Sequence, residues 1–332
     1  MASFRLSMAL ESGAVTLPGT GRIALFRPRA THDLSALPVP RLDAIQGFFP
    51  EHRALVRAGI RTLLAPDRDA RYSAAVVFLP RARDEAQALV ARARDIAGQV
   101  IVDGQKTDGV DSMLKAIRRN GAQPGEVWSK AHGKVFSFTG GSFEHWKTPD
   151  LRAIGGGFVT APGVFSADAP DPGSQALIAA LPAGLRGRIC DLGAGWGFLA
   201  AQVLKHHPGV QECHLVEAEH RALECARRNV ADPRAHFHWA DALDFRPGPT
   251  FDHVVTNPPF HTGRAADPGL GRGFIAAAPG LLRANGTLWL VANRHLPYEQ
   301  NLSEAFAEVA EVAGDRAFKV FRARRPRQRR TG

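Results

Sequence analysis

Two consecutive prolines end an apolar strand in the second half of the chain. Residues 251–255 form an apolar run that predicts a buried strand, and Asn257-Pro258-Pro259-Phe260 follows it after one threonine. Because proline cannot donate to a sheet ladder, the chain must leave the strand here. The residue before a proline is held in extended geometry, so the amide of Asn257 is expected at the carboxyl end of that strand. Open α/β sheets bind their ligands at this edge.

The side chains of this short stretch suit a particular kind of ligand. Asn257 offers an acceptor oxygen, the two prolines give a backbone without donors, and Phe260 offers an aromatic face. Together these groups would accommodate a planar group that carries an NH2. A turn that ends a strand beside a core phenylalanine is the alternative.

A glycine-rich turn lies earlier in the same half of the chain. Residues 188–192 predict a short strand, Gly193-Ala194-Gly195-Trp196-Gly197 follows, and residues 198–206 predict a helix. Such a turn lets a ligand approach the backbone and directs amide N–H groups at it, although a tight packing turn has the same composition. The dinucleotide-binding pattern needs glycine where this chain has Phe198, which disfavours an oxidoreductase. Asp191, just before the first glycine, is placed for a cationic group such as an amino-acid ammonium.

Two further acids are expected at successive strand ends. Glu217 follows the predicted strand 212–216 and could accept hydrogen bonds from both hydroxyls of a ribose. Asp241 follows the predicted strand 235–239 and could accept from an adenine amino group. Each acid alone could be a surface charge, but in series after a glycine turn they indicate a nucleoside site. The candidate ligand-binding residues of this half are Asp191, Gly193, Gly195, Gly197, Glu217, Asp241 and Ala242.

The first half of the chain repeats the order of elements of the second half without its glycine turn. Strands and helices alternate in both halves, which predicts an α/β fold. We infer a duplicated domain whose first copy lost its active site and binds no nucleotide cofactor, with coincidence between two common α/β units as the alternative. Residues 41–65 have helix-like spacing. The strands that we expect to correspond are 75–79, 100–103 and 133–138 in the first half and 253–256, 287–292 and 318–323 in the second.

Length and charge set the domain boundaries and the class of partner. A chain of 332 residues suggests two domains, which we place at residues 1–150 and 151–323 with a linker near 146–157. Residues 324–332 are expected to be a basic tail. The net charge is +10, and the run from Arg322 to Arg330 supplies six positive charges. A basic patch indicates a polyanion such as nucleic acid, although a solvated tail is equally consistent. The basic residues of the first half that would be free to contact phosphate are Lys106, Arg118, Arg119, Lys130 and Lys134.

Several classes of protein are not expected from this composition. The three cysteines have no C-x-x-C spacing, which predicts reduced thiols in a cytoplasmic protein. No run of about 18 apolar residues is present, and the first residues lack the apolar core of a signal peptide, so no membrane span is expected. The histidines lack zinc spacing, and we expect no metal, with His236 and His238 as ordinary strand residues.

The motifs in sequence resemble a known family. Asp191–Gly197, Glu217, Asp241 and Asn257–Phe260 resemble the successive motifs of class I S-adenosylmethionine-dependent methyltransferases. Residues 155–323 resemble more specifically the ribosomal RNA guanine-N2 methyltransferases, in the branch that acts on 16S small-subunit RNA. That family also has an inactive methyltransferase-like amino-terminal domain, so the resemblance reaches the first half as architecture. The segments that carry the specific resemblance are Pro162–Ser166, Asp171–Ser174, Asn257–Gly263 and Val291–Tyr298.

The resemblance implies a fold, a reaction and a set of roles. The fold is two Rossmann-like methyltransferase domains in tandem, the amino-terminal one degenerate and the carboxyl-terminal one catalytic. The reaction is methyl transfer from S-adenosylmethionine to the exocyclic N2 of a guanine in ribosomal RNA. Asn257 and Pro258 would accept hydrogen bonds from the amino group, and Phe260 would stack on the base. The residues implied in substrate binding are Pro259, His261 and Phe165.

Other substrates and a role without catalysis remain open at this stage. The same tetrapeptide would serve methylation of a guanine in 23S ribosomal RNA, of adenine N6 or of a protein glutamine amide, because each presents a planar NH2. A non-catalytic RNA-binding assembly factor that kept the fold is the alternative of another class.

Overall fold

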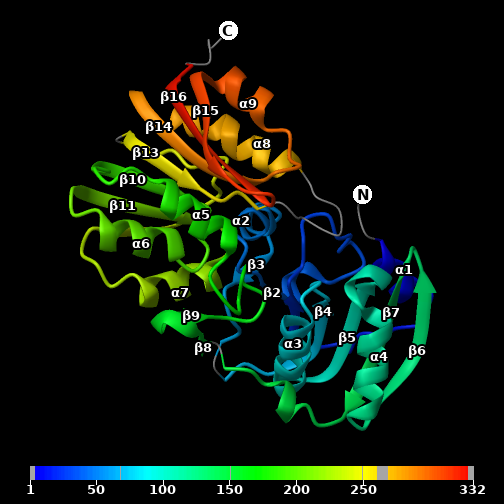
Figure 1. Ribbon diagram of the computed structural model, residues 1–332. Helices are drawn as coiled ribbons and strands as arrows, with labels where there is room; N and C mark the ends of the chain where they lie inside the picture. The colour runs from blue at the N-terminus through cyan, green and yellow to red at the C-terminus, as the bar shows by residue number, and fades with distance from the viewer. Residues whose placement is uncertain (1–3, 68, 150, 249, 260–267, 328–332) are drawn as a thin grey trace. The chain divides into compact units, whose positions relative to one another are not determined.

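The chain divides into two compact units, residues 1–150 and 151–332. The computed structural model describes residues 4–67, 69–149, 151–248, 250–259 and 268–327 (Figure 1). Each unit is built around its own seven-stranded mixed sheet. Within the described residues, every helix is too short or too polar to cross a membrane.

The first unit has helices on both faces of its sheet. One face packs against α3 and α4, and the other against α1 and α2. The strands are β1 Ile23–Phe26, β2 Leu42–Ile45, β3 Arg61–Leu63, β4 Tyr72–Phe78, β5 Ala97–Gln105, β6 Ala122–Lys130 and β7 Gly133–Gly140. The helices are α1 Arg5–Glu11, α2 Phe49–Arg57, α3 Arg83–Ile96 and α4 Val110–Arg119, with 3-10 turns at Val39–Arg41, Lys106–Asp108 and Glu144–Trp146.

The second unit repeats this plan and adds a small ribbon. Helices α5, α6 and α7 cover one face of its sheet, and α8 and α9 cover the other. The strands are β8 Arg152–Ala153, β9 Val159–Thr160, β10 Gly187–Leu192, β11 Val210–Glu217, β12 Ala235–Trp239, β13 Phe251–Thr256, β14 Leu282–Asn293, β15 Phe306–Gly314 and β16 Phe318–Pro326. The helices are α5 Pro172–Ala180, α6 Phe198–His206, α7 His220–Asn229, α8 Pro268–Ala277 and α9 Glu299–Ala305, with 3-10 turns at Gly155–Gly157 and Ala278–Gly280.

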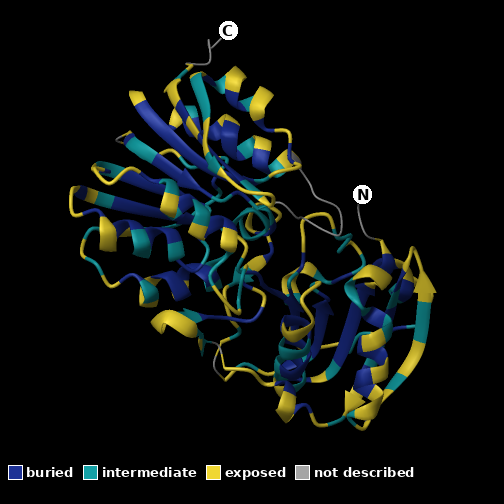
Figure 2. Cartoon of the chain, viewed as in Figure 1, coloured by how far each residue is buried: buried dark blue, intermediate teal, exposed yellow. Residues whose placement is uncertain are grey.

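The two sheets have the same topology. The strand order is β3-β2-β1-β4-β5-β7-β6 in the first and β12-β11-β10-β13-β14-β16-β15 in the second. In both, the first five strands of this order run parallel and the last two pairings are antiparallel. Strands β4, β5 and β7 therefore correspond to β13, β14 and β16, as the repeated order of elements predicted. The central strands are buried in both units, as expected for parallel strands covered on two faces (Figure 2).

In the first unit, side chains occupy the end of β1, the position that corresponds to the glycine turn of the second unit. Arg27 follows β1 as Gly193 follows β10, and both have positive φ and donate backbone N–H to the neighbouring strand. The Arg27 guanidinium donates from Nε to Glu85 at 2.7 Å and from Nη1 to Gln46 at 3.4 Å. After β4, Leu79 stands where Asn257 follows β13. The amino-terminal domain is therefore degenerate, because it has neither the open turn nor the amide.

Three expectations from the sequence were wrong in detail. Residues 41–65 contain β2, α2 and β3 rather than one broken helix. The boundary between the units falls after residue 150, within the predicted linker 146–157, but the linker is shorter than predicted. Trp146 is buried in the core of the first unit, and residues 152–160 carry the β8–β9 ribbon of the second. Residues 324–326 belong to β16 rather than to a tail, and Arg324 faces Glu308 of β15 in the register.

Candidate functional site

The site lies where the strand order of the second sheet reverses. β10 and β13 are neighbours there, and the chain leaves them in different directions, to α6 and towards α8. The buried hydroxyl of Thr256 at the end of β13 donates to the carbonyl of Leu192 at the end of β10, over 2.7 Å. This bond holds Asn257 beside the glycine-rich turn. Crevices at such switch points are where open α/β sheets bind ligands.

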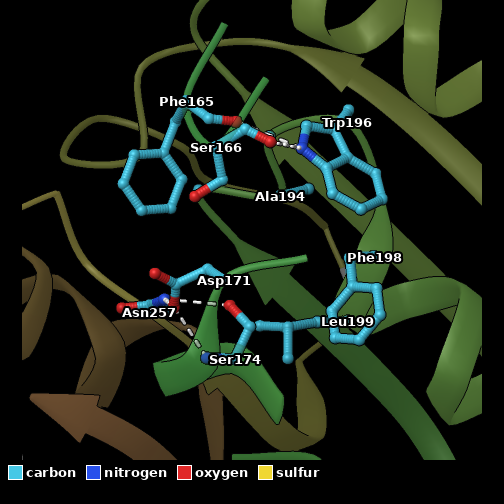
Figure 3. A pocket seen from close by; sticks show the side chains of 11 residues that line it. Phe165, Ser166, Asp171, Ser174, Ala194, Trp196, Phe198, Leu199 and Asn257 are labelled. Carbon is cyan, nitrogen blue, oxygen red and sulfur yellow. Dashed lines mark hydrogen bonds between the residues drawn. The ribbon is translucent and has the colours of Figure 1, made fainter. Parts of the chain in front are cut away.

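A small pocket, open to solvent, lies at this switch point. Figure 3 shows its two sides: Phe165, Ser166 and Trp196 lie on one, and Asn257, Asp171 and Ser174 lie on the other. The residues that line it are Phe165, Ser166, Asp171, Ser174, Gly193, Ala194, Gly195, Trp196, Phe198, Leu199 and Asn257.

The amide of Asn257 is held by the start of α5. Its Nδ2 donates to Asp171 Oδ2 at 2.7 Å and to Ser174 Oγ at 2.9 Å (Figure 3). Its Oδ1 is buried and has no hydrogen-bond partner among the described residues. Asp171 is also the N-cap of α5, because the same carboxylate oxygen accepts from Ser174 N at 2.8 Å. The contact between Asp171 and Asn257 was not predicted from the sequence.

Trp196 ties the opposite side of the pocket to the glycine turn. Its indole N–H donates to the carbonyl oxygens of Phe165 at 3.1 Å and Ser166 at 3.3 Å. Ser166 has a φ of 50°, and the Phe165 side chain is 55% exposed. The ring of Trp196 is buried against Phe158 and Phe198. The exposed Phe165 thus lines the pocket on a segment that a buried tryptophan anchors.

The three glycines of the turn have different reasons to be glycine. All have positive φ, 78° at Gly193, 56° at Gly195 and 88° at Gly197. A Cβ at Gly193 would lie 2.9 Å from the Phe274 ring, whereas one at Gly195 would meet nothing within 4 Å. A Cβ at Gly197 would press on α7 at Ala226, and Gly197 does not line the pocket. Gly193 and Gly195 are therefore the two that a ligand can approach.

Asp191 lies behind the turn rather than on the pocket wall. It is fully buried, its Oδ2 accepts from Ala200 N at 3.0 Å, and its Oδ1 has no partner among the described residues. Burial raises the pKa of Asp191 to about 7, the nearby Glu217 adds to the rise, and the Ala200 hydrogen bond opposes it. The contact with an ammonium group stays a prediction.

The other two predicted acids lie at the end of β11 and just after β12, and neither lines the pocket. Glu217 accepts from Gly195 N and from Glu219 N, each at 2.8 Å, which places its carboxylate beside the glycine turn. Burial raises the pKa of Glu217, against these backbone hydrogen bonds. Asp241 accepts from Leu243 N at 2.9 Å, and the neighbouring Ala242 is buried.

The remaining predicted residues follow Asn257 directly. Pro258 is buried and Pro259 is half-buried, and neither lines the pocket. Phe260 and His261, to which the sequence assigned base stacking and substrate contact, lie outside the described residues.

Sequence reasoning missed three residues that shape the site: Asp171, Ser174 and Trp196. Asp171 and Ser174 were named only within a segment that carries the family resemblance, and Trp196 only within the glycine-rich turn. A capping motif predicts a backbone contact and cannot reveal which distant side chain shares it.

A group of possible metal ligands lies on strands β11 and β12 of the second sheet. Glu212, His214 and His236 each offer a ligand atom within 4.8 Å of the others. His214 Nε2 lies 3.2 Å from Glu212 Oε2, which also accepts from Arg188 Nε at 2.6 Å, and His214 Nδ1 lies 2.9 Å from His238 Nε2. Burial lowers the pKa of His214 and lowers that of His238 to about 4. His236 and His238 belong to β12, as the sequence predicted.

Comparison with known proteins agrees with this geometry. The family described as Methyltransferase small domain matches residues 155–322. Ribosomal RNA small subunit methyltransferase C of Alteromonas mediterranea is 30% identical over 262 residues, 75% of this chain and 72% of that protein. The protein of the same name from Hahella chejuensis is 30% identical over 81% of this chain and 82% of its own length. The solved structure of the T. thermophilus 16S rRNA N2 methyltransferase with AdoMet and guanosine superposes with a TM-score of 0.76 at 26% identity, over 93% of this chain and 90% of that one. The chain therefore belongs to the small-domain methyltransferase family, in the branch of the ribosomal RNA small subunit methyltransferases C.

Proposed function

We propose that this protein transfers a methyl group from S-adenosylmethionine to the exocyclic N2 amino group of a guanine in 16S ribosomal RNA. The observation that carries the proposal is the Asn257 amide, whose buried oxygen has no partner among the described residues at the switch point of the sheet. An aromatic amino group is a donor that such an oxygen can accept from. The solved relative with AdoMet and guanosine supports the same assignment.

The pocket above the glycine turn suits S-adenosylmethionine, which supplies an electrophilic methyl group when bound. Gly193 and Gly195 let a ligand approach the backbone. Because they lack a Cβ, they adopt their left-handed conformation without a steric penalty. We assign Asp191 to the methionine ammonium, directly or through water.

The strand-end acids are assigned to the nucleoside part of the cofactor. Glu217 keeps free lone pairs on both oxygens beyond its two backbone bonds, so it can accept from ribose hydroxyls. Asp241 is assigned to the adenine amino group, with Ala242 beside the ring. These roles rest on position, since Glu217 ends β11 and Asp241 follows β12, the strand next to it in the sheet.

Asn257 and Pro258 would activate the amino group by binding it. Guanine N2 is a poor nucleophile because its lone pair is delocalised into the ring. Two acceptors, Asn257 Oδ1 and the Pro258 carbonyl, would hold its N–H groups. This would favour a pyramidal nitrogen, whose lone pair is available to attack the methyl group. Positioning and electrostatics would then supply the rate. No general base is needed before transfer, because the methylated amine is acidic and loses its proton readily. Phe260 is assigned to stacking on the base, with Phe165, Pro259 and His261 as further substrate contacts.

The first unit is assigned to RNA recognition. The base must leave its helix or loop to enter the pocket, which requires RNA contacts beyond the active site. Lys106, Arg118, Arg119 and Lys130 are exposed on this unit, whereas Lys134 pairs with Asp111 at 2.6 Å. Ribosomal RNA as substrate also puts the reaction in the cytoplasm.

One incubation tests the proposed reaction. The protein would be mixed with methyl-labelled S-adenosylmethionine and small ribosomal subunits assembled on unmodified 16S RNA, and the RNA would then be digested to nucleosides. Label in N2-methylguanosine supports the proposal. Label in N6-methyladenosine or in protein would replace it with one of the alternatives. A parallel incubation with large subunits tests 23S RNA, and label found only there would also replace it. Binding of RNA without any transfer would indicate an assembly factor.

A further inference from the structure

Asn257 has one side that donates and one that accepts, and its neighbours decide which side is left for a ligand. Both hydrogen-bond partners of its Nδ2 come from the start of α5, Asp171 at 2.7 Å and Ser174 at 2.9 Å. These contacts use both N–H donors of the amide. What remains is Oδ1, which is buried and has no partner among the described residues.

Asp171 fixes this orientation because it cannot donate. An ionised carboxylate is an acceptor only, so turning the amide over would bring Oδ1 against Asp171 Oδ2. The Ser174 hydroxyl can donate or accept, and it follows whichever end the amide presents. Asp171 therefore selects the orientation and Ser174 reinforces it.

The feature that needs an explanation is Asn257 Oδ1, which has no partner among the described residues. Few buried acceptors in native proteins lack a partner, and each such case calls for an explanation. Here the described side chains satisfy the nitrogen completely and leave the oxygen without a partner.

We infer that Asp171 and Ser174 are positioning residues that hold the Asn257 oxygen ready for an N–H donor. They would thereby select a base that carries an amino group over one that lacks it. The inference rests on the proposed methylation of a guanine amino group, and it assigns to the start of α5 a share in that specificity.

The helix cap must be kept separate from this role. Asp171 also accepts from Ser174 N at 2.8 Å, so removing its side chain would loosen α5 as well. Asp171→Ser keeps a residue that caps helices well but is too short to reach Asn257. Ser174→Ala removes only the hydroxyl, since the backbone N–H of the cap remains. Asp171→Asn serves as the conservative variant. Its amide could donate, but the helix cap holds its side-chain oxygen against Ser174 N, and that oxygen still faces Asn257 Nδ2.

The experiment compares guanosine with inosine, which lacks only the 2-amino group. Calorimetry with S-adenosylmethionine present would give the affinity of each nucleoside, and transfer to small subunits would give kcat and KM. For Asp171→Ser and for the double variant with Ser174→Ala, we expect the preference for guanosine and kcat each to fall about tenfold, with little change in KM for RNA. Asp171→Asn should stay within about threefold of wild type, and Ser174→Ala should lie between.

Control measurements separate a structural effect from a positioning effect. Asp232→Ser removes another carboxylate that accepts from a backbone N–H, that of Arg234 at 2.9 Å, next to the start of β12 and away from the switch point. Its nucleoside preference should match wild type. Thermal unfolding should show that Asp171→Ser still folds cooperatively, since a good cap is kept.

Two results would overturn the inference. One is a wild-type protein that binds inosine as tightly as guanosine. The other is a folded Asp171→Ser variant with an unchanged preference and unchanged kcat. The proposed function fails separately, if wild type places no label in N2-methylguanosine whatever the variants do.

Discussion

The Trp196 indole donates to the Phe165 carbonyl over 3.1 Å, which joins the glycine-rich turn to the segment that carries the exposed Phe165. The two residues are 31 positions apart, and the sequence treated their segments as separate motifs. The bond makes them one side of the pocket. The glycine-rich turn and the Phe165 segment should therefore respond together when it is removed.

Trp196→Phe is expected to weaken cofactor binding as well as stability. The variant keeps an aromatic ring but leaves the Phe165 and Ser166 carbonyls without their donor. The loss in free energy of unfolding should be about 1–2 kcal/mol, the cost of unsatisfied buried polar groups. Calorimetric affinity for S-adenosylmethionine should fall about threefold to tenfold, because the pocket side becomes less ordered.

Trp289→Phe is the matched control for that prediction. Trp289 is a buried tryptophan of β14, and its indole lies 3.4 Å from His253 Nδ1 in the core. It should lose stability and keep cofactor affinity. Equal cofactor affinity in both variants would show that the Trp196–Phe165 bond does not shape the pocket.

Asn257→Ala is expected to lose catalysis with little loss of cofactor binding. Removing the acceptor should cost about 2–4 kcal/mol of transition-state stabilisation, a fall in kcat of about 30- to 1000-fold. Rates with labelled cofactor and small subunits measure the loss, and calorimetry checks that S-adenosylmethionine still binds. Near-wild-type turnover would remove Asn257 from the catalytic residues.

The parts of the fold that the sequence predicted are those with local signals. The helix 198–206 was placed at its observed bounds because a glycine turn precedes it and apolar residues recur at helical spacing. β2 and β3 were missed because they have only four and three residues, and their burial comes from neighbouring strands rather than from their own pattern. The predicted strand 318–323 continues to Pro326 as β16, an extension that the density of arginines concealed.

The candidate site was predictable in place but not in orientation. Strand ends followed by glycine, acid or proline put Gly193, Glu217 and Asn257 at one edge of the sheet, and the topology confirms that edge. Which atom of Asn257 is left free depends on Asp171, 86 residues earlier in the chain. Contacts across such a separation leave no periodic signal in a single sequence.

Gly193→Ala should destabilise the protein more than Gly195→Ala. Both positions have positive φ, so each alanine pays about 1–2 kcal/mol for a left-handed conformation. Only the Cβ at Gly193 would also lie 2.9 Å from the Phe274 ring, so a packing cost is added there. Urea unfolding of the two variants measures the difference. Equal losses would mean that Phe274 yields without cost.

Asp191 should make stability depend on pH in a window set by its raised pKa. Burial raises the pKa of this carboxyl from 3.8 to about 7, so the folded protein keeps a proton that the unfolded chain has released. The stability contributed by the protonated form is present below about pH 4 and is lost as the pH rises towards 7, by at most about 1.4 kcal/mol per pH unit. Asp191→Asn cannot titrate, so wild type should lose stability relative to it across this window and then level off.

Urea unfolding of wild type and Asp191→Asn at intervals from pH 4 to pH 8 measures this difference. Asp232→Asn is the control, because the Arg234 side chain lowers the pKa of Asp232 and moves its titration below the window. Its stability difference from wild type should therefore stay flat. If the stability difference for Asp191→Asn is flat as well, Asp191 is ionised in the folded protein throughout this pH range. A cation or water would then have to reach its Oδ1, which has no partner among the described residues.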